Sequence, residues 1–495
     1  MTMLNAGKIS WFDYFMLLPI LGLAFYLVFI PHQSYPYALH VDEWVHLARS
    51  RAIMQAGSTT FVDPFSGVGT VSLSSNLEAG FHLFWGVFQA ISGISWMAIF
   101  RYFPGVIFVI TVLSVYIAAR REGFGWEAAF FACLIPSTIG VLGPVFLVPA
   151  SVGLLFTPLI IFLAFNFRSI WSYLLIFVLT VFLLSIHAPS AIFPIIVLAP
   201  YILLNLKGNF KHSLATALAL ALPFLIIFPW IFNLLLPTAK SLLSPTTQSE
   251  FVVLPRVIQT YGFLPILFSL LGVFVLAIRG GNKNYGLILG LLAMLLMLVS
   301  YYTFNYGIWI MYERGLTFMM LVASIVAGAG LMVVKNLTLP ASFDTWLTPF
   351  ITRNAGRFLC LVLIAVTLFV AIPERQSALY YQMIDEEDYQ AFVWIEEHLG
   401  KDYQKAILDP WKATAFTAIT GKTIYTRTHS YPTDKDRRAY DFLEQGSAST
   451  TFLKENGISI VYTRVYDTDR NKNFDYSSNN PDLTEVARNI YLLKD

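Results

Sequence analysis

The chain is organised around the polar stretch His40-Val41-Asp42-Glu43-Trp44-Val45-His46-Leu47-Ala48-Arg49-Ser50-Arg51. It follows the first apolar segment, at about residues 12–31, and gathers two adjacent carboxylates, two imidazoles and two guanidinium groups. Ionisable side chains at a membrane are costly and by default mark a functional site. This stretch is therefore the first candidate site.

Composition decides which physics governs the rest of the chain. Of its 495 residues, 57% are hydrophobic and only 13% are charged, against about 25% charged in a typical soluble domain. We therefore expect an integral membrane protein that contacts the lipid bilayer. The net charge of +2, without a Lys/Arg-rich run, predicts no nucleic-acid partner. Cys133 and Cys360 fall in apolar runs and are expected to pack without a disulfide.

Eleven apolar runs are long enough to cross a bilayer. They lie at about 12–31, 102–119, 126–141, 151–167, 170–186, 190–206, 213–235, 262–279, 284–303, 315–334 and 357–373. The first run lacks a small-residue cleavage site, so it predicts a retained helix rather than a signal peptide. A twelfth run, at about 79–97, is also long enough to span, and counting it would reverse every later loop.

The positive-inside rule decides how the run at 79–97 lies. If that run lies flat on the membrane, the later basic loops share the side of Lys8, whereas a twelfth span would move them to the opposite side. These basic residues are Arg120, Arg121, Arg168, Lys207, Lys211, Arg279, Lys283, Lys335 and Arg353. We therefore expect 79–97 to be an interfacial helix, with Trp85 at headgroup level and His82 facing outward.

The resulting topology is a multi-pass cell-membrane protein with its N-terminus in the cytoplasm and its C-terminus outside. Residues 1–373 form the transmembrane α-helical domain, and 32–101 form its first outer loop with interfacial helices. From about 374, charges return and helical and strand patterns alternate, which predicts a small extracytoplasmic α/β domain over 374–495. Its expected helices are 386–399, 411–419 and 434–444, and its expected strands are 405–408, 423–426 and 458–463. No nucleotide, zinc or redox motif occurs there, so docking or acceptor recognition is its expected role.

Asp42 and Glu43 are the first candidates for chemistry. They can bind a divalent cation or act as a general base on an acceptor hydroxyl or amide. Helix capping is the alternative; it explains Asp42 alone but calls for neither His46 nor Arg49. Arg49 and Arg51 can hold a phosphate through paired hydrogen bonds, with headgroup anchoring as the alternative.

Three further places carry polar groups on the predicted outer side. Glu250 ends Thr247-Gln248-Ser249-Glu250, where it is either functional or a solvated loop acid. Glu313 and Arg314 stand at the start of a predicted span, and Arg314 either binds phosphate or forms an anchoring ion pair with Glu313. His187 interrupts the turn between two spans, where a structural role is the usual one.

The order of these features resembles the GT-C superfamily of membrane glycosyltransferases, and most closely the catalytic subunit of oligosaccharyltransferases. The matching positions are Val41 to Arg49, Gly57, Asp63-Pro64, Asn76-Leu77-Glu78-Ala79-Gly80, Gly125 to Pro136, Thr247 to Glu250 before Tyr261-Gly262, and Glu313-Arg314-Gly315. Each motif is short, and their order of appearance carries the resemblance across most of the chain.

The resemblance implies transfer of a sugar from a polyprenyl-phosphate or -diphosphate donor to a glycan, lipid or protein acceptor on the outer face, with inversion. It makes Asp42 the catalytic carboxylate, Glu250 a mobile-loop acid and Arg314 a contact to the donor phosphate. Glu43, His46 and Arg49 then support Asp42. The other substrate-binding candidates are His82, His187 and Glu313. A divalent cation, Mg²⁺ or Mn²⁺, is implied on Asp42.

Two departures separate this chain from oligosaccharyltransferases. Residues 137–151, in the second outer loop, contain no Asp or Glu, whereas that family uses acids there to hold a metal. Asp409-Pro410-Trp411-Lys412-Ala413 stands where that family has its WWDYG motif, which reads the protein acceptor's sequon. We therefore predict a related glycosyltransferase with another acceptor. Two alternatives stay open: a non-catalytic glycolipid-binding or scaffold subunit, and a transporter or flippase of a lipid-linked substrate.

Overall fold

The computed structural model describes residues 11–65, 78–138, 140–241, 254–338, 349–378, 380, 382–400, 402–428, 432–467, 469–470 and 472–494. Contacts between residues divide the chain into two units. The helical unit comprises Met1–Pro31 and Tyr102–Ala378, and the mixed unit comprises His32–Arg101 and Leu379–Asp495. The first outer loop therefore belongs with the C-terminal residues, whereas the sequence grouped it with the transmembrane domain.

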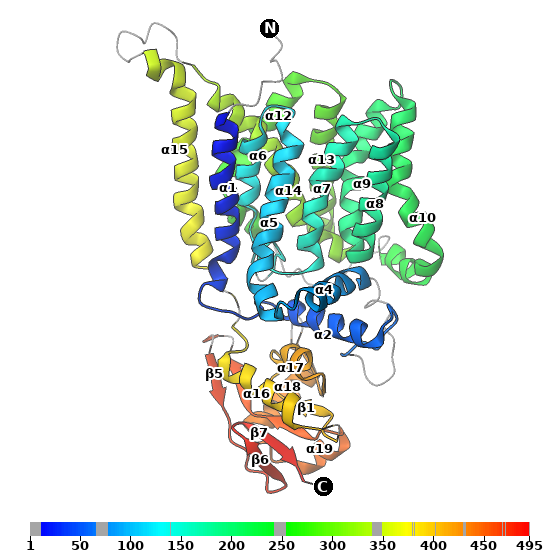
Figure 1. Ribbon diagram of the computed structural model, residues 1–495, viewed down its shortest axis with the longest axis vertical. Helices are drawn as coiled ribbons and strands as arrows, with labels where there is room; N and C mark the ends of the chain where they lie inside the picture. Colours follow the sequence, from blue (N-terminus) through cyan, green and yellow to red (C-terminus); the bar gives the residue numbers. More distant parts are fainter. Residues whose placement is uncertain are drawn as a thin grey trace. The chain divides into compact units, whose positions relative to one another are not determined.

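The helical unit is built from long apolar helices (Figure 1). They are α1 (Trp11–Phe29), α5 (Trp96–Arg120, shared with the mixed unit), α6 (Gly125–Cys133), α7 (Pro149–Asn166), α8 (Ile170–Ile186), α9 (Ala188–Asn205), α10 (Phe210–Ser241), α11 (Leu254–Tyr261), α12 (Phe263–Arg279), α13 (Asn282–Phe304), α14 (Trp309–Lys335) and α15 (Pro349–Gln376). Within the described residues, eight helices are long and apolar enough to cross a membrane, and α8 and α12 are shorter apolar helices. The expected multi-pass helical protein is confirmed; the number of spans and the side of each end stay predictions.

One expected span is wrong. The run at 126–141 forms only the nine-residue helix α6, and the segment from Ile135 to Val148 has no regular helix, Ile139 lying outside the described residues. Pro136 explains the early end of α6, because proline lacks the N–H that a helix needs and disfavours the helical conformation of the residue before it.

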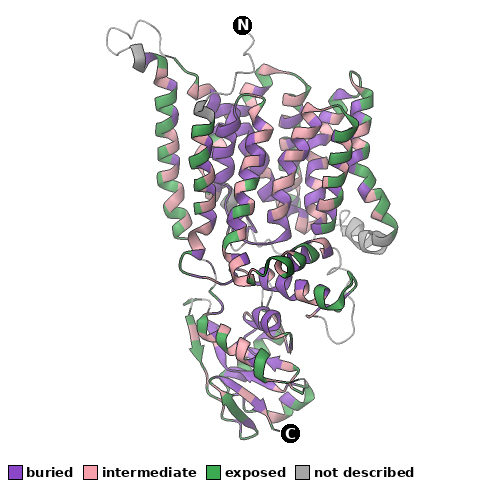
Figure 2. Ribbon diagram, viewed as in Figure 1, coloured by how far each residue is buried: buried purple, intermediate pink, exposed green. Residues whose placement is uncertain are grey.

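Helix α14 forms the buried centre of the helical unit and packs against α6, α12 and α13. Small residues allow this close approach: a Cβ added at Gly272 would lie 1.9 Å from the carbonyl oxygen of Val326. Close packing over small residues is the usual means of joining helices in a membrane. By contrast, α15 exposes apolar side chains along most of its length (Figure 2), as expected for a helix that faces lipid.

Several basic residues of the helical unit bind polar groups in the turns that join its helices. Lys283 Nζ donates to Asn166 Oδ1 at 3.1 Å, and Arg168 Nη1 donates to Asn209 Oδ1 at 3.0 Å. Arg279 Nη1 donates to the carbonyl of Glu122 at 3.2 Å. The side of the membrane on which these turns lie stays a prediction.

The mixed unit contains α2 (Val41–Ala56) and α4 (Ala79–Ser92) from the first loop and an α/β fold from the C-terminal residues. The latter comprises α16 (Glu386–His398), β1 (Lys405–Ile407), α17 (Ala413–Thr420), β2 (Thr423–Ile424), α18 (Asp434–Glu444), α19 (Thr450–Glu455), β3 (Ile460–Tyr462), β4 (Arg464–Asp467), β5 (Lys472–Asp475), β6 (Leu483–Ala487) and β7 (Ile490–Leu493). Its five-stranded sheet has the order β2-β1-β3-β7-β6, parallel from β2 to β3 and antiparallel thereafter, beside the β4–β5 hairpin.

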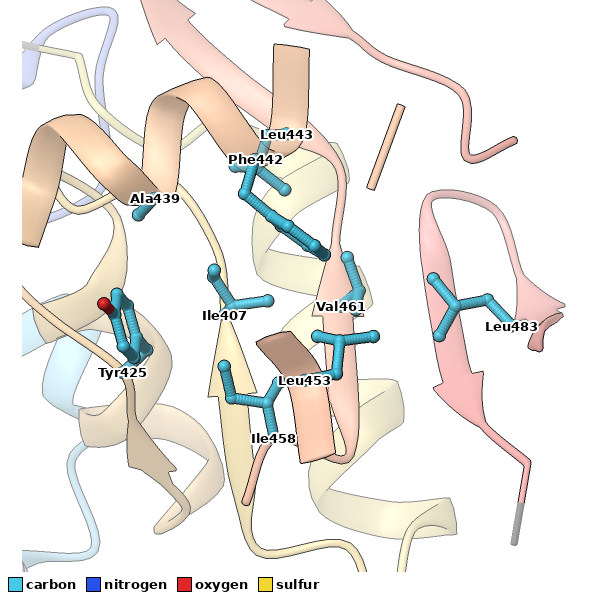
Figure 3. Packing of buried hydrophobic residues seen from close by; sticks show 9 residues of the cluster. All are labelled: Ile407, Tyr425, Ala439, Phe442, Leu443, Leu453, Ile458, Val461 and Leu483. Atoms are coloured by element: carbon cyan, nitrogen blue, oxygen red, sulfur yellow. The ribbon is translucent and has the colours of Figure 1, made fainter. Parts of the chain in front are cut away.

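The sheet separates two helical layers because successive strand residues point to opposite faces. Ile407 and Val461 pack with Leu443 of α18 and Leu453 of α19 in one core cluster (Figure 3). On the other face, the ring of Tyr462 lies 5.2 Å from that of Phe392 on α16. The predicted α/β domain is thus present, and it places the ends of β1 and β3 beside the segments described next.

The first loop is bound into this fold by specific contacts. Tyr35 Oη donates to the carbonyl of Ile384 at 2.8 Å, and Tyr37 Oη donates to Glu386 Oε2 at 2.6 Å. Arg51 Nη1 donates to the carbonyls of Ala418 and Ile419, both at 2.9 Å. Arg51 therefore anchors α2 to the C-terminal end of α17, where a cation also complements the helix dipole, rather than binding phosphate or headgroups.

Helix α4 differs from the interfacial helix expected over 79–97. It ends at Ser92, where Gly93 takes a left-handed φ of 67°, and both Trp85 and His82 are buried instead of reaching outward. The residues that are exposed are the apolar Leu83, Phe84, Val87 and Ile91. Both faces of α4 are apolar in sequence, so the pattern did not show which face packs on α2; the exposed face still suits a membrane surface.

Candidate functional site

The N-terminus of α2 is capped without using Asp42. His40 is the N-cap residue, and its Nδ1 accepts from the backbone N–H of Asp42 at 3.2 Å. Glu43 Oε2 accepts from the N–H groups of Leu39 and His40 at 2.8 and 3.1 Å, and Glu43 is fully buried. This arrangement is a capping box. Glu43 thus shapes the helix start, and the adjacent Asp42 has its Oδ2 3.7 Å from Nδ1 of His40.

Asp42, His46 and Arg49 share one face of α2, because residues four and seven positions apart lie above one another on a helix. Arg49 Nη2 forms a 2.9 Å ion pair with Asp63 Oδ2. Asp63 Oδ1 also accepts from the N–H of Phe65 at 3.1 Å. The sequence comparison quoted Asp63 only as part of a motif; the structure shows that it holds Arg49.

A further arginine, Arg427, reaches this place from the segment after β2. Its guanidinium lies over the ring of Phe65, 4.3 Å from the ring centre. Burial lowers the pKa of Arg427, and the positive charge of Arg49 lowers it further, while Asp63 and Asp42 raise it. The charges of Asp42, Arg49 and Asp63 thus all act on Arg427, and we call these four residues the acid–arginine cluster.

The two guanidinium groups of the cluster differ in their contacts. Arg49 is paired with Asp63. Within the described residues, Arg427 forms no direct hydrogen bond or ion pair, although the charges of Asp63 and Asp42 act on it. Guanidinium groups are well suited to phosphate because their planar N–H groups bind it in pairs. The cluster can therefore bind an anion beside a carboxylate. Sequence reasoning missed Arg427, because no local motif marks it.

His46 also faces a second group of polar residues. Its Nδ1 lies 3.0 Å from Nε2 of His82 and 3.9 Å from Oε2 of Glu78. Burial holds the pKa of His82 well below its ordinary value, and the nearby His46 and Arg49 lower it further. His82 is therefore a neutral ring at physiological pH, available as a hydrogen-bond partner or a metal ligand.

The remaining candidates belong to the helical unit or lie outside the described residues. His187 ends α8 and precedes α9, with its Nδ1 2.7 Å from Ser190 Oγ. Glu313 is buried in the first turns of α14. Arg314 is half-buried there, and its two predicted alternatives, phosphate binding and an anchoring pair with Glu313, stay predictions. Glu250 lies in the undescribed segment 242–253.

The segment that replaces the WWDYG motif is part of a buried polar network. Asp409 accepts from the backbone N–H of Trp411 at 2.9 Å and from Tyr440 Oη at 2.8 Å. Lys412 Nζ forms a 2.7 Å ion pair with Asp388, and both side chains are fully buried. Burial raises the pKa of Asp409, and Lys412 opposes that rise. Side chains buried in this way stabilise the fold and do not meet an acceptor.

No protein-family model matches the sequence, and no curated protein matches it significantly. Solved structures do share its fold. The archaeal oligosaccharyltransferase AglB from Archaeoglobus fulgidus, in complex with an inhibitory peptide and a dolichol-phosphate, matches with a TM-score of 0.61 and 12% identity, over 92% of this chain and 70% of that one. Arabinofuranosyltransferase AftD from Mycobacteria matches with a TM-score of 0.58 and 17% identity, over 98% of this chain but 38% of that longer chain.

A third similar structure has about the length of this chain. ArnT from Cupriavidus metallidurans, bound to undecaprenyl phosphate, matches with a TM-score of 0.53 and 13% identity, over 94% of both chains. At these identities the likeness concerns the fold. This chain therefore has the GT-C fold of membrane glycosyltransferases, which the order of its motifs predicted.

Proposed function

We propose that this protein is a membrane glycosyltransferase that moves a sugar from a polyprenyl-phosphate or -diphosphate donor to an acceptor on the outer face of the membrane. The observation that carries the proposal is the acid–arginine cluster, in which the charge of Asp42 acts on Arg427 together with the Arg49–Asp63 pair. The fold supports it, because two proteins with this fold were solved with dolichol-phosphate and with undecaprenyl phosphate.

The chemistry needs a base and a group that stabilises the leaving phosphate. In the proposed reaction, Asp42 takes the proton of the acceptor hydroxyl or amide as the acceptor forms its bond to the anomeric carbon. The bond between that carbon and the phosphate oxygen breaks, and the phosphate leaves with the electron pair. Arg427 stabilises the charge that develops on it, since fixed positive groups aimed at a developing anion lower the barrier. Arg49 adds positive charge on the same side.

Other residues take supporting roles in this proposal. Glu43 fixes the start of α2, and His46, one turn after Asp42, contacts His82. Glu250 is proposed as a second acid, Arg314 as a further contact to the donor phosphate, and His187 and Glu313 as substrate-binding groups, as the family resemblance implies. A divalent cation on Asp42 is part of the same proposal.

Asp42→Asn tests the assignment of the base. The variant keeps the size of the side chain and the His40–Glu43 cap, so we expect normal expression and normal binding of undecaprenyl phosphate. Sugar transfer is expected to fall at least 100-fold, because general-base catalysis contributes about 10²–10⁴-fold. The assay is mass analysis of lipid-linked sugars and glycan products in membranes of cells that carry only the variant.

The same assay separates the alternatives. An enzyme that has lost its base accumulates the donor and lacks the product. A scaffold subunit or a flippase would give unchanged products with Asp42→Asn, although deleting the whole protein would remove them. Unchanged transfer by Asp42→Asn would thus overturn the assignment.

A further inference from the structure

His46, Glu78 and His82 bring three metal-ligating groups together between α2 and the start of α4. One ligand atom from each of the three residues lies within 4.8 Å of the other two. Both imidazoles are buried, and Glu78 is half-buried at the edge of the group. Within the described residues, this is the one group of three or more His, Cys, Asp or Glu side chains whose ligand atoms converge in this way.

The distance between the two rings fits two ligands of one ion. Zinc–imidazole bonds of about 2.0–2.1 Å place two nitrogen ligands about 2.8–3.4 Å apart at bond angles from square to tetrahedral. His46 Nδ1 and His82 Nε2 are 3.0 Å apart. A hydrogen bond between the rings has a similar length, but it uses the two rings alone. A cation also attracts the Glu78 carboxylate, whose Oε2 faces the same His46 nitrogen at 3.9 Å.

We propose that His46, Glu78 and His82 bind one divalent transition-metal ion of the zinc class, which clamps α2 to α4. Two imidazole nitrogens and one carboxylate oxygen suit zinc, whereas Mg²⁺ and Ca²⁺ prefer oxygen ligands. Three protein ligands leave a fourth position for water.

This site is separate from the cation that the family resemblance implies on Asp42. Its ligands come from one loop and include no residue of the second outer loop. It does not rest on the proposed glycosyl transfer, since it concerns only how two helices are joined.

The clamp fits the way that α2 and α4 pack. A Cβ added at Gly86 would lie 2.6 Å from Met54 Cγ and 3.3 Å from the carbonyl oxygen of Ser50, so the two helices are already in close contact there. His46 lies one turn after Asp42 on the same face of α2. An ion held by His46 therefore also fixes the helix face that carries Asp42.

Zinc binding to the full-length protein tests the proposal. The purified protein is treated with a chelator, equilibrated with Zn²⁺, and analysed for bound metal by mass spectrometry and for its Tm. We expect one zinc per chain, a higher Tm with zinc, and no displacement by a large excess of Mg²⁺. His46→Ala and His82→Ala should lose the bound zinc, and Glu78→Gln should weaken binding about tenfold or more.

His398→Ala is the matched control, because His398 is an exposed histidine of the same unit. It should bind zinc as the wild type does. Glu78→Gln keeps the side-chain shape at a half-buried position, so it reports on the site even if the buried histidine variants fail to fold. Wild-type zinc affinity in Glu78→Gln, or less than one zinc per chain in the wild type, would overturn the proposal.

Discussion

Replacing Arg427 with alanine should weaken binding of the lipid-phosphate donor while changing the stability of the fold only a little. Charge-assisted hydrogen bonds contribute about 1.5–3 kcal/mol, and about 1.4 kcal/mol is tenfold in affinity. Arg427→Ala should therefore weaken lipid-phosphate binding about 10- to 100-fold. The fold should lose little, because Asp63 keeps its 2.9 Å pair with Arg49. The lost contact with Phe65 is worth about 0.5–1 kcal/mol, while relief of the repulsion from Arg49 and loss of the attraction to Asp63 and Asp42 act in opposite directions.

Binding of undecaprenyl phosphate to the protein in nanodiscs measures the first effect, and the Tm measures the second. Arg437→Ala is the matched control, since Arg437 lies in the same unit and is exposed, with only a 3.6 Å pair to Asp434. Arg464→Ala is the structural contrast, because Arg464 is buried and pairs with Asp385, Glu387 and Asp475. Binding by Arg427→Ala within twofold of the wild type, or a loss of Tm as large as that of Arg464→Ala, would refute the reasoning.

Three further variants probe other parts of the molecule. Lys412→Met leaves the buried Asp388 without its ion-pair partner and should cost about 3–5 kcal/mol of stability, seen as a clear fall in Tm. His82 has a pKa held well below its ordinary 6.5, so the stability that its neutral form contributes is complete above about pH 6.5 and is lost as the pH falls; His82→Gln should flatten the fall of Tm on acidification. Arg314→Ala should weaken donor binding more than acceptor binding, which a labelled-lipid binding assay measures.

Most helices and the position of the α/β fold could be predicted from the sequence. The length of an apolar run and the density of charged residues can both be read from neighbouring residues. The apolar runs predicted most of the helices, and the change of composition near residue 374 located the α/β fold. The prediction of a span at 126–141 failed because average hydrophobicity outweighed Pro136, which ends the helix. The strands from β4 onward were not predicted, because they are short and several of their residues are polar and exposed.

The candidate site was only partly readable. Asp42 stood out because it is an acid beside a membrane span, but its partner Arg427 is 385 positions away in the chain, and no periodicity connects them. His82 was expected to face outward and is buried against His46. The side to which His82 points depends on how α4 packs against α2, and the sequence of α4 alone does not contain this information.

In the polar stretch His40–Arg51, the position of each charged residue on α2 decides whether its role is structural or chemical. Glu43 forms the helix cap, and Arg51 donates to the carbonyls at the end of α17. Glu43 lies in the first turn of α2 and Arg51 in its second half, so the helix is held at two points along its length. Asp42, His46 and Arg49 lie on one face of α2, and each meets a group from elsewhere in the chain or from a later part of the loop. In a charged stretch of this kind, the residues that make structural contacts should therefore be identified first, since the remaining charged residues are those available to a substrate.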